Sequence, residues 1–96
     1  MDISQKDNGK SGLFYIESNG ELIAEMTYTW LDQKLISLDH TEVNEKLEGN
    51  GVGKNILKFA VEFARKQEIK ILPLCSFAKH VFETMPDYND VLKPLR

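Results

Sequence analysis

The sequence predicts one domain of the mixed α/β (α+β) class, in which an antiparallel meander of three strands is followed by a helix, a parallel strand and a C-terminal helix. Apolar residues recur at every second position between residues 22 and 30, which is typical of a half-buried strand. After residue 52 they recur at helical spacing instead. The length of 96 residues is enough for one compact domain and too short for two.

The N-terminal part predicts the first hairpin. Residues 1–12 are polar, and we expect a flexible N-terminus there, ahead of a single domain over residues 13–96. Residues 13–16 are apolar and aromatic and predict the first strand. The dipeptide Asn19-Gly20 that follows is a strong signal for a tight hairpin turn.

The next run alternates cleanly and predicts a long second strand. A turn at Asp32-Gln33 leads into a third strand over residues 34–43. The two faces of this third strand differ less, so we expect a bulge near Asp39 and His40. The larger side chains of the second strand share its core face: Leu22, Ala24, Met26, Tyr28 and Trp30.

The C-terminal half predicts two helices around a short strand. The first helix is expected over residues 52–67. A helical crossover precedes the apolar strand at residues 69–74, so we expect that strand to lie parallel to the third and inside the sheet. Residues 76–85 predict a second helix, with Ser76 as its N-cap and Pro86 at its end. The first helix has one apolar stripe, made of Ile56, Leu57, Ala60, Phe63 and Ala64.

Composition narrows the class of protein. With 12 basic and 15 acidic residues the formal net charge is −3, which does not favour nucleic acid binding but tolerates a cationic acceptor. The single cysteine cannot form an internal disulfide, and no apolar run is long enough to span a membrane. We therefore expect a cytoplasmic protein.

Three glycines alternate directly before the first helix, at Gly49, Gly51 and Gly53. A helix start offers free N–H groups and a partial positive charge, so this loop favours a bound phosphate or pyrophosphate. The alternative is a tight strand-to-helix turn without a ligand. The spacing fits neither a P-loop nor a dinucleotide-binding fingerprint, because the glycines and the Ser or Thr that these motifs need are missing.

The loop Glu48-Gly49-Asn50-Gly51-Val52-Gly53 resembles the signature of the GNAT superfamily of acyl-CoA N-acyltransferases, Arg/Gln-x-x-Gly-x-Gly/Ala. Two glycines match, and Glu48 stands where the family has Arg or Gln. The likeness extends over about residues 13–90, so the expected fold is a truncated GNAT-like one. Residues 73–78 and 86–88 are similar to a compact single-domain subgroup.

The resemblance implies acetyl-CoA (coenzyme A) as the cofactor. It implies that the pyrophosphate binds to backbone N–H groups of residues 50–54 and that the pantetheine arm lies along residues 41–43. A carboxylate at Glu48 would repel a pyrophosphate, so we expect it to turn outward or to weaken binding. The predicted cofactor-binding residues are Thr41, Glu42, Val43, Gly49, Asn50, Gly51, Val52, Gly53 and Lys54.

Cys75 and His40 are the candidate catalytic residues. Cys75 precedes a helix start, which lowers a thiol pKa and favours the reactive thiolate, and the resemblance places it where the thioester arrives. His40 is a candidate general base for an amine or for Cys75. The alternatives are a small buried cysteine in the core and an ordinary half-buried histidine. Two isolated histidines and one cysteine predict no metal site.

The predicted function is therefore acetyl-CoA-dependent N-acetylation of an exposed amine on a small molecule or a protein, with Cys75 as the candidate acetyl carrier. The alternative is a non-catalytic acyl-CoA-binding or sensing module. Two features favour that alternative: Phe82 stands where the family often has a tyrosine acid, and few residues precede the first predicted strand to wall an acceptor pocket. A structural domain without a ligand is the third hypothesis, which the glycine loop opposes.

Overall fold

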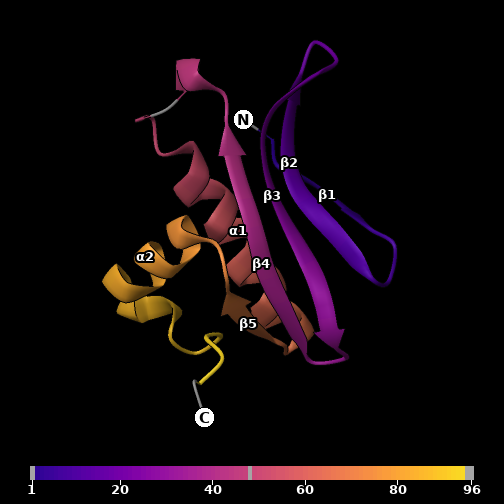
Figure 1. Cartoon of the computed structure of the whole chain (residues 1–96), viewed down its shortest axis with the longest axis vertical. Helices are drawn as coiled ribbons and strands as arrows, with labels where there is room; N and C mark the ends of the chain where they lie inside the picture. Colours follow the sequence, from indigo (N-terminus) through magenta and orange to yellow (C-terminus); the bar gives the residue numbers. More distant parts are fainter. Residues whose placement is uncertain (1, 48, 95–96) are drawn as a thin grey trace.

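The computed structural model describes residues 2–47 and 49–94. Within them the chain forms a five-stranded sheet in the order β1-β2-β3-β4-β5 and two α-helices (Figure 1). The predicted α+β fold class is confirmed. The elements are β1 (Ser4–Asp7), β2 (Ser11–Ser18), β3 (Glu21–Asp32), β4 (Leu35–Val43), α1 (Val52–Gln67), β5 (Lys70–Pro73) and α2 (Ser76–Thr84), with short 3-10 helices at Glu45–Leu47 and Pro86–Tyr88.

The N-terminal segment corrects the prediction of a three-strand meander. Ser4–Asp7 pairs antiparallel with β2, so the meander has four strands, and this segment is part of the sheet rather than a flexible N-terminus. The turn between the two strands is held by Asn8, whose side chain accepts hydrogen bonds from the backbone N–H groups of Lys10 and Ser11 at 2.9 Å each. The strand was missed because its side chains are mostly exposed and polar, so it shows no apolar alternation.

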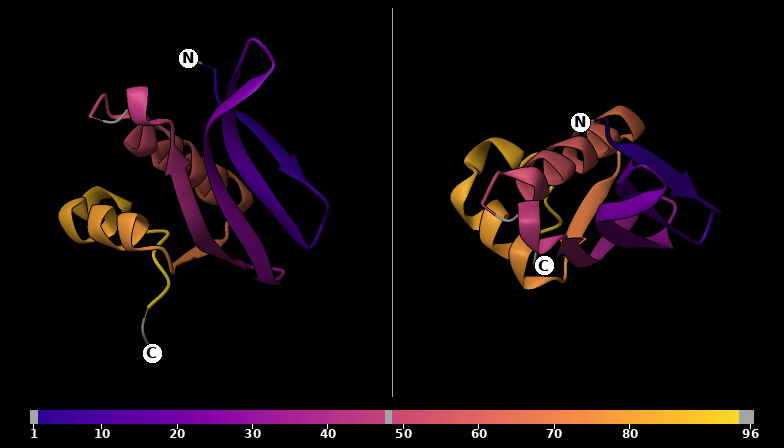
Figure 2. Two further views of the ribbon diagram at one scale, coloured as in Figure 1. Left: turned by 45° about the horizontal axis from the view of Figure 1, so that its top comes forward. Right: turned by 90° about the horizontal axis from the view of Figure 1, so that it is seen from above.

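The core lies between one face of the sheet and α1. The helix has the predicted bounds, and its predicted apolar stripe is buried except for Phe63, which is half-buried. On the sheet side Phe14 stacks on Tyr28 with ring centroids 4.9 Å apart and meets Phe59 and Phe63 edge-on at 5.7 Å each. Figures 1 and 2 show that α1 covers one face, while no helix in the described part of the chain covers the other face over β2 and β3. We call this second face the open face.

The predicted bulge in β4 is confirmed at Asp39. Thr27 pairs with His40 and Tyr28 pairs with Leu38, so Asp39 has no partner across the strand pair. Its carboxylate accepts hydrogen bonds from the hydroxyls of Thr29, at 2.6 Å, and Ser37, at 2.7 Å.

The extra residue determines which side chains of β4 share a face. Above the bulge, Thr41 and Val43 lie opposite the buried Met26 and Ala24 and therefore face α1. His40 and Glu42 alternate with them, and both side chains lie exposed on the open face.

β5 is parallel to β4, as predicted, but it is the edge strand rather than an inner one. The chain enters α2 directly after it, so no further strand pairs along it except for an isolated bridge between Ile71 and Leu92. Pairing with β4 ends at Leu38, whose carbonyl accepts from the N–H groups of both Leu74, at 2.9 Å, and Cys75, at 3.1 Å. Beyond that point β4 continues to Val43 without a β5 partner.

Candidate functional site

A groove lies where the unpaired end of β4 meets the start of α1. Its volume is about 500 Å³. It brings together seven of the nine predicted cofactor-binding residues: Thr41, Val43, Gly49, Gly51, Val52, Gly53 and Lys54. We call it the cofactor groove.

The other two predicted residues lie elsewhere. Glu42 is on the open face, and Asn50 lines a separate hollow with Ile3 and Asn55. Two lining residues of the cofactor groove were not predicted, Leu47 and Phe77. Leu47 was the one apolar side chain in an otherwise polar loop, which is the signal that could have identified it. Phe77 lies in the groove because of the way α2 packs against the sheet and α1, and the sequence pattern does not specify that packing.

The three glycines have two different roles. Gly49 and Gly51 have φ values of +84° and +73°, in the left-handed region that favours glycine. Gly53 is helical, and a Cβ atom there would lie 2.9 Å from Cζ of Phe77. The first two glycines therefore shape the loop, and the third lets the Phe77 ring close over the helix start.

The start of α1 suits an anion. Its N-cap is Gly51, so no side chain caps the first N–H groups, and the first turn contains no acidic residue. Lys54 lines the groove beside them. The partial positive charge of a helix start and an ammonium group thus meet at one end of the groove. Glu48 lies outside the described residues, so its orientation stays a prediction.

Cys75 lies next to this groove. The structure corrects the predicted cap of α2, because the N-cap is Cys75 rather than Ser76. The Cys75 Sγ accepts a hydrogen bond from the Ala78 N–H at 3.4 Å and lies 3.3 Å from the Thr41 hydroxyl, which itself lines the groove. The thiol is half-buried. The sulfur therefore lies at a helix start with a hydroxyl beside it.

His40 does not join Cys75 in the described contacts. It lies on the open face, whereas its neighbour Thr41 faces the other way and touches Cys75. The two candidate catalytic residues therefore lie on opposite sides of β4. Phe82 is buried and packs against the Tyr88 ring at 6.1 Å, so the position expected for a tyrosine acid belongs to the core.

Two other kinds of feature are absent from the part of the chain that the structure describes. The described residues bring no group of three His, Cys, Asp or Glu side chains together to hold a metal ion. None of the helices that the structure describes is long and apolar enough to cross a membrane.

Comparison with known proteins agrees with the fold and identifies the family. The family model described as GCN5-related N-acetyl-transferase matches residues 13–91. Protein NATD1 of Xenopus tropicalis is 32% identical over 73 residues, which are 74% of this chain and 67% of that protein. Protein NATD1 of Homo sapiens is 30% identical over 73 residues, 74% of this chain and 65% of that protein. The chain thus spans about two thirds of the length of these relatives.

Solved structures share the architecture. A GCN5-like protein of Staphylococcus aureus, determined by NMR, is 43% identical with a TM-score of 0.78, and the match covers 99% of this chain and 90% of that one. A GNAT family acetyltransferase from Elizabethkingia anophelis with acetyl-CoA bound has a TM-score of 0.62 and 18% identity, covering 82% of this chain and 53% of that one. At that identity the second likeness concerns the fold alone.

Proposed function

We propose that this chain, which belongs to the GCN5-related N-acetyl-transferase family, binds acetyl-CoA in the cofactor groove and transfers the acetyl group to an exposed amine. The observation that carries the proposal is the groove itself. It unites a glycine loop, an uncapped helix start and the unpaired end of β4. Acetyl-CoA bound in the Elizabethkingia anophelis acetyltransferase of the same fold supports this choice of ligand.

The two ends of the groove fit the two parts of the cofactor. The backbone N–H groups at the start of α1 and the Lys54 ammonium suit the pyrophosphate. The apolar side chains of Val43, Leu47 and Phe77 suit the pantetheine arm, and the unpaired edge of β4 offers backbone groups to hydrogen-bond it. Cofactor binding by Thr41, Val43 and residues 49–54 is part of the proposal, whereas Glu42 lies on the open face, away from the cofactor groove.

Cys75 is the proposed acetyl carrier. Its thiolate attacks the thioester carbonyl carbon, so a C–S bond forms at Cys75 while the C–S bond to coenzyme A breaks and coenzyme A leaves as a thiolate. The Thr41 hydroxyl, 3.3 Å from Sγ, is placed to donate a hydrogen bond to the attacking sulfur. A neutral acceptor amine then attacks the acetylated cysteine, the C–N bond forms, and the Cys75 thiolate is released.

His40 is the proposed base on the acceptor side. Because it lies on the open face, it would meet an amine that approaches across that face rather than the Cys75 thiol. In this scheme the imidazole takes the proton that the amine loses as the C–N bond forms.

A second function has one observation in its favour. Phe82 is buried in the core, so the position at which the family often has a tyrosine acid has no proton donor. This favours a non-catalytic acyl-CoA-binding module, which would bind the cofactor but never transfer the acetyl group.

Titration with acetyl-CoA, followed by backbone amide shifts and intact mass, separates these functions. The proposal expects shifts at residues 41–43 and 49–54, an added acetyl mass that hydroxylamine removes, and loss of that mass in Cys75→Ala with cofactor affinity retained. Amide shifts without any acetyl transfer would favour the binding module. An adduct that persists in Cys75→Ala would rule out Cys75 as the acetyl carrier. The absence of amide shifts at millimolar acetyl-CoA would refute the proposed function.

A further inference from the structure

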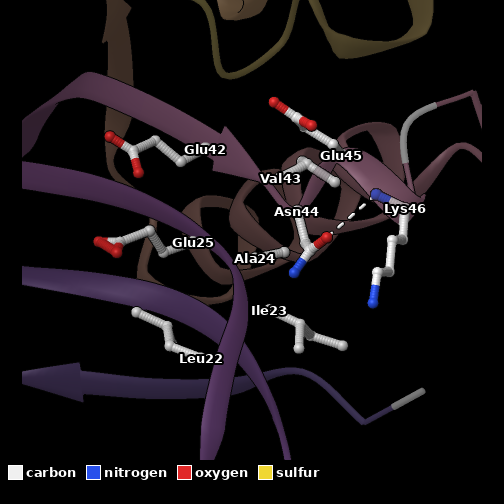
Figure 3. Close-up of a pocket in the computed structure, with 9 residues that line it drawn as sticks. All are labelled: Leu22, Ile23, Ala24, Glu25, Glu42, Val43, Asn44, Glu45 and Lys46. Carbon is white, nitrogen blue, oxygen red and sulfur yellow. Dashed lines mark hydrogen bonds between the residues drawn. The ribbon is translucent and has the colours of Figure 1, made fainter.

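A second groove, of about 440 Å³, lies on the open face where β3 begins and β4 ends. Figure 3 shows its lining, in which Glu25 and Glu42 project side by side from the two strands and Glu45 lies beyond Val43. Val43 lines this groove and the cofactor groove alike. The two grooves are thus separated by the end of β4.

The carboxylates in this groove form an uncompensated pair. Glu25 and Glu42 lie directly opposite each other in the β3–β4 register, and like charges in such positions destabilise a sheet. The ion pair found among the described residues joins Arg65 to Asp90, far along the chain from both. Lys46 lines the groove too, but Figure 3 shows its ammonium group directed away from the carboxylates. A cation from outside would relieve the repulsion.

The same groove also has an apolar component. Leu22 is 44% exposed, although it begins the apolar alternation of β3, and Ile23 beside it is half-buried. A ligand that combines a positive charge with a chain of methylene groups would cover these side chains while its charge meets Glu25 and Glu42. Lysine and arginine side chains have this chemistry.

We infer that the acceptor is a basic polypeptide segment, which lies across the open face with its cationic side chains on Glu25, Glu42 and Glu45. The inference rests on the proposed acetyl transfer and names its substrate class. The carboxylates favour a cationic partner because the charges are complementary. The open shape of the surface favours an extended polymer over a small molecule. An open sheet face encloses too little of a small amine, whereas an extended segment gains contact along its length.

The geometry connects this docking surface to the chemistry. His40 and Glu42 lie two residues apart on one face of β4, which places them about 7 Å apart along the strand. Thr41 lies between them and contacts Cys75 on the other side. In an extended segment held at Glu42, a side chain two residues along would therefore lie at His40, beside the point where β5 leaves β4.

The test uses a ten-residue lysine- and arginine-containing peptide and a matched peptide in which glutamine replaces the arginines. Binding is measured from amide shifts, and transfer is measured by peptide mass with acetyl-CoA present. Glu25→Gln combined with Glu42→Gln should weaken binding of the basic peptide by about fivefold, reduce its salt dependence and raise KM, because two exposed charge pairs are lost. The affinity for acetyl-CoA should not change.

The matched control is Glu62→Gln combined with Glu83→Gln, which removes two exposed carboxylates from the helices instead. Equal loss of peptide affinity in this control, or an unchanged affinity in the double variant of the groove, overturns the inference. Efficient acetylation of a small polyamine, with no competition from the basic peptide, also overturns it. Peptide binding at these carboxylates without any acetyl transfer would refute the proposed activity and leave a docking surface for basic segments.

Discussion

The two ends of the sheet treat their polar groups in opposite ways. At the β1 end, the Asp7 carboxylate accepts hydrogen bonds from the Tyr28 hydroxyl at 2.5 Å, the Trp30 indole N–H at 2.8 Å and the Gly9 N–H at 2.7 Å. The Gln5 amide donates to the same Tyr28 hydroxyl at 2.8 Å. This cluster, which we call the aromatic end, also contains the Phe14 ring, which stacks on Tyr28, and the Phe63 ring, which meets Phe14 edge-on.

The cofactor groove has the contrary arrangement. The start of α1 has no side-chain cap, β4 runs past the end of β5, and two loop glycines have left-handed backbones. Elements that a stable protein would normally complete are left for a ligand to complete. Stability and ligand binding therefore depend on different ends of the sheet, so variants at one end should change stability and variants at the other should change binding.

Phe14→Ala should have the largest effect on stability. Phe14 is fully buried among three aromatic rings, so its removal should cost about 3–5 kcal/mol of the free energy of unfolding. Urea denaturation measures the loss. Phe14→Leu, which should cost less, keeps the test possible if the alanine variant does not fold. A loss of acetyl-CoA affinity in folded Phe14→Leu would show that the two ends are coupled.

Gly51→Val should abolish acetyl-CoA binding at a smaller cost in stability. A β-branched residue at φ +73° should cost about 1–2 kcal/mol and deform the loop at the helix start. Isothermal titration measures the affinity. The matched control is Gly20→Val, since Gly20 has φ +78° and, like Gly51, open space around the position of its Cβ. Gly20→Val should destabilise by a similar amount and bind normally; loss of binding in both variants would point to strain alone.

Stability at low pH should depend on the aromatic end. Burial raises the pKa of Asp7, but hydrogen bonds from Tyr28, Gly9 and Trp30 outweigh it, so its pKa lies below the ordinary value of 3.8. Ionised Asp7 therefore stabilises the fold above about pH 4, and this contribution is lost as the pH falls through the folded pKa. In urea unfolding curves, the difference in free energy of unfolding between the wild type and Asp7→Asn should become smaller below pH 4. A constant difference would mean that the carboxylate charge is unimportant.

Cys75→Ser should have the smallest effect on stability, which should rise slightly, while the rate of acetyl adduct formation should fall. Serine caps helices better than cysteine, whose sulfur accepts weakly at 3.4 Å, so stability should rise by a few tenths of a kcal/mol. Acetyl adduct formation should become much slower, because an alcohol is a poor nucleophile without strong activation. Thermal unfolding and intact mass test both parts. An undiminished adduct would exclude attack by Cys75.

The elements that show a regular apolar pattern in the sequence were predicted correctly. The apolar stripe and the glycine before it determined α1 to the residue, and the indistinct faces of β4 indicated the bulge. The strand Ser4–Asp7 was not predicted because an edge strand with exposed polar side chains has no amphipathic pattern. Cys75 and Ser76 are adjacent and both can cap a helix, so only the backbone decides between them.

The residues of the candidate site likewise include some that a local sequence signal identifies and some that it does not. The glycine loop and the β4 residues facing it were predicted because a helix start and a sequence signature identify them. Phe77 and the opposition of Glu25 to Glu42 depend on how distant segments pack and pair, which no local pattern specifies. The position of Glu42 on the open face depends on the bulge and its register.

The unpaired residue Asp39 divides β4 into two segments whose odd and even positions are out of phase. In the segment before it, even-numbered residues such as Ile36 and Leu38 face the core; in the segment after it, odd-numbered residues do. Straightening β4 without removing a residue would exchange the two sides of this second segment, so that His40 and Glu42 faced the helix and Thr41 and Val43 faced water, whereas deleting Asp39 would leave all four on their present sides. The face that each of these side chains occupies thus depends on a count of residues as much as on their identity, and an alignment with a relative that lacks the bulge needs a one-residue gap here to match side chains of the same face.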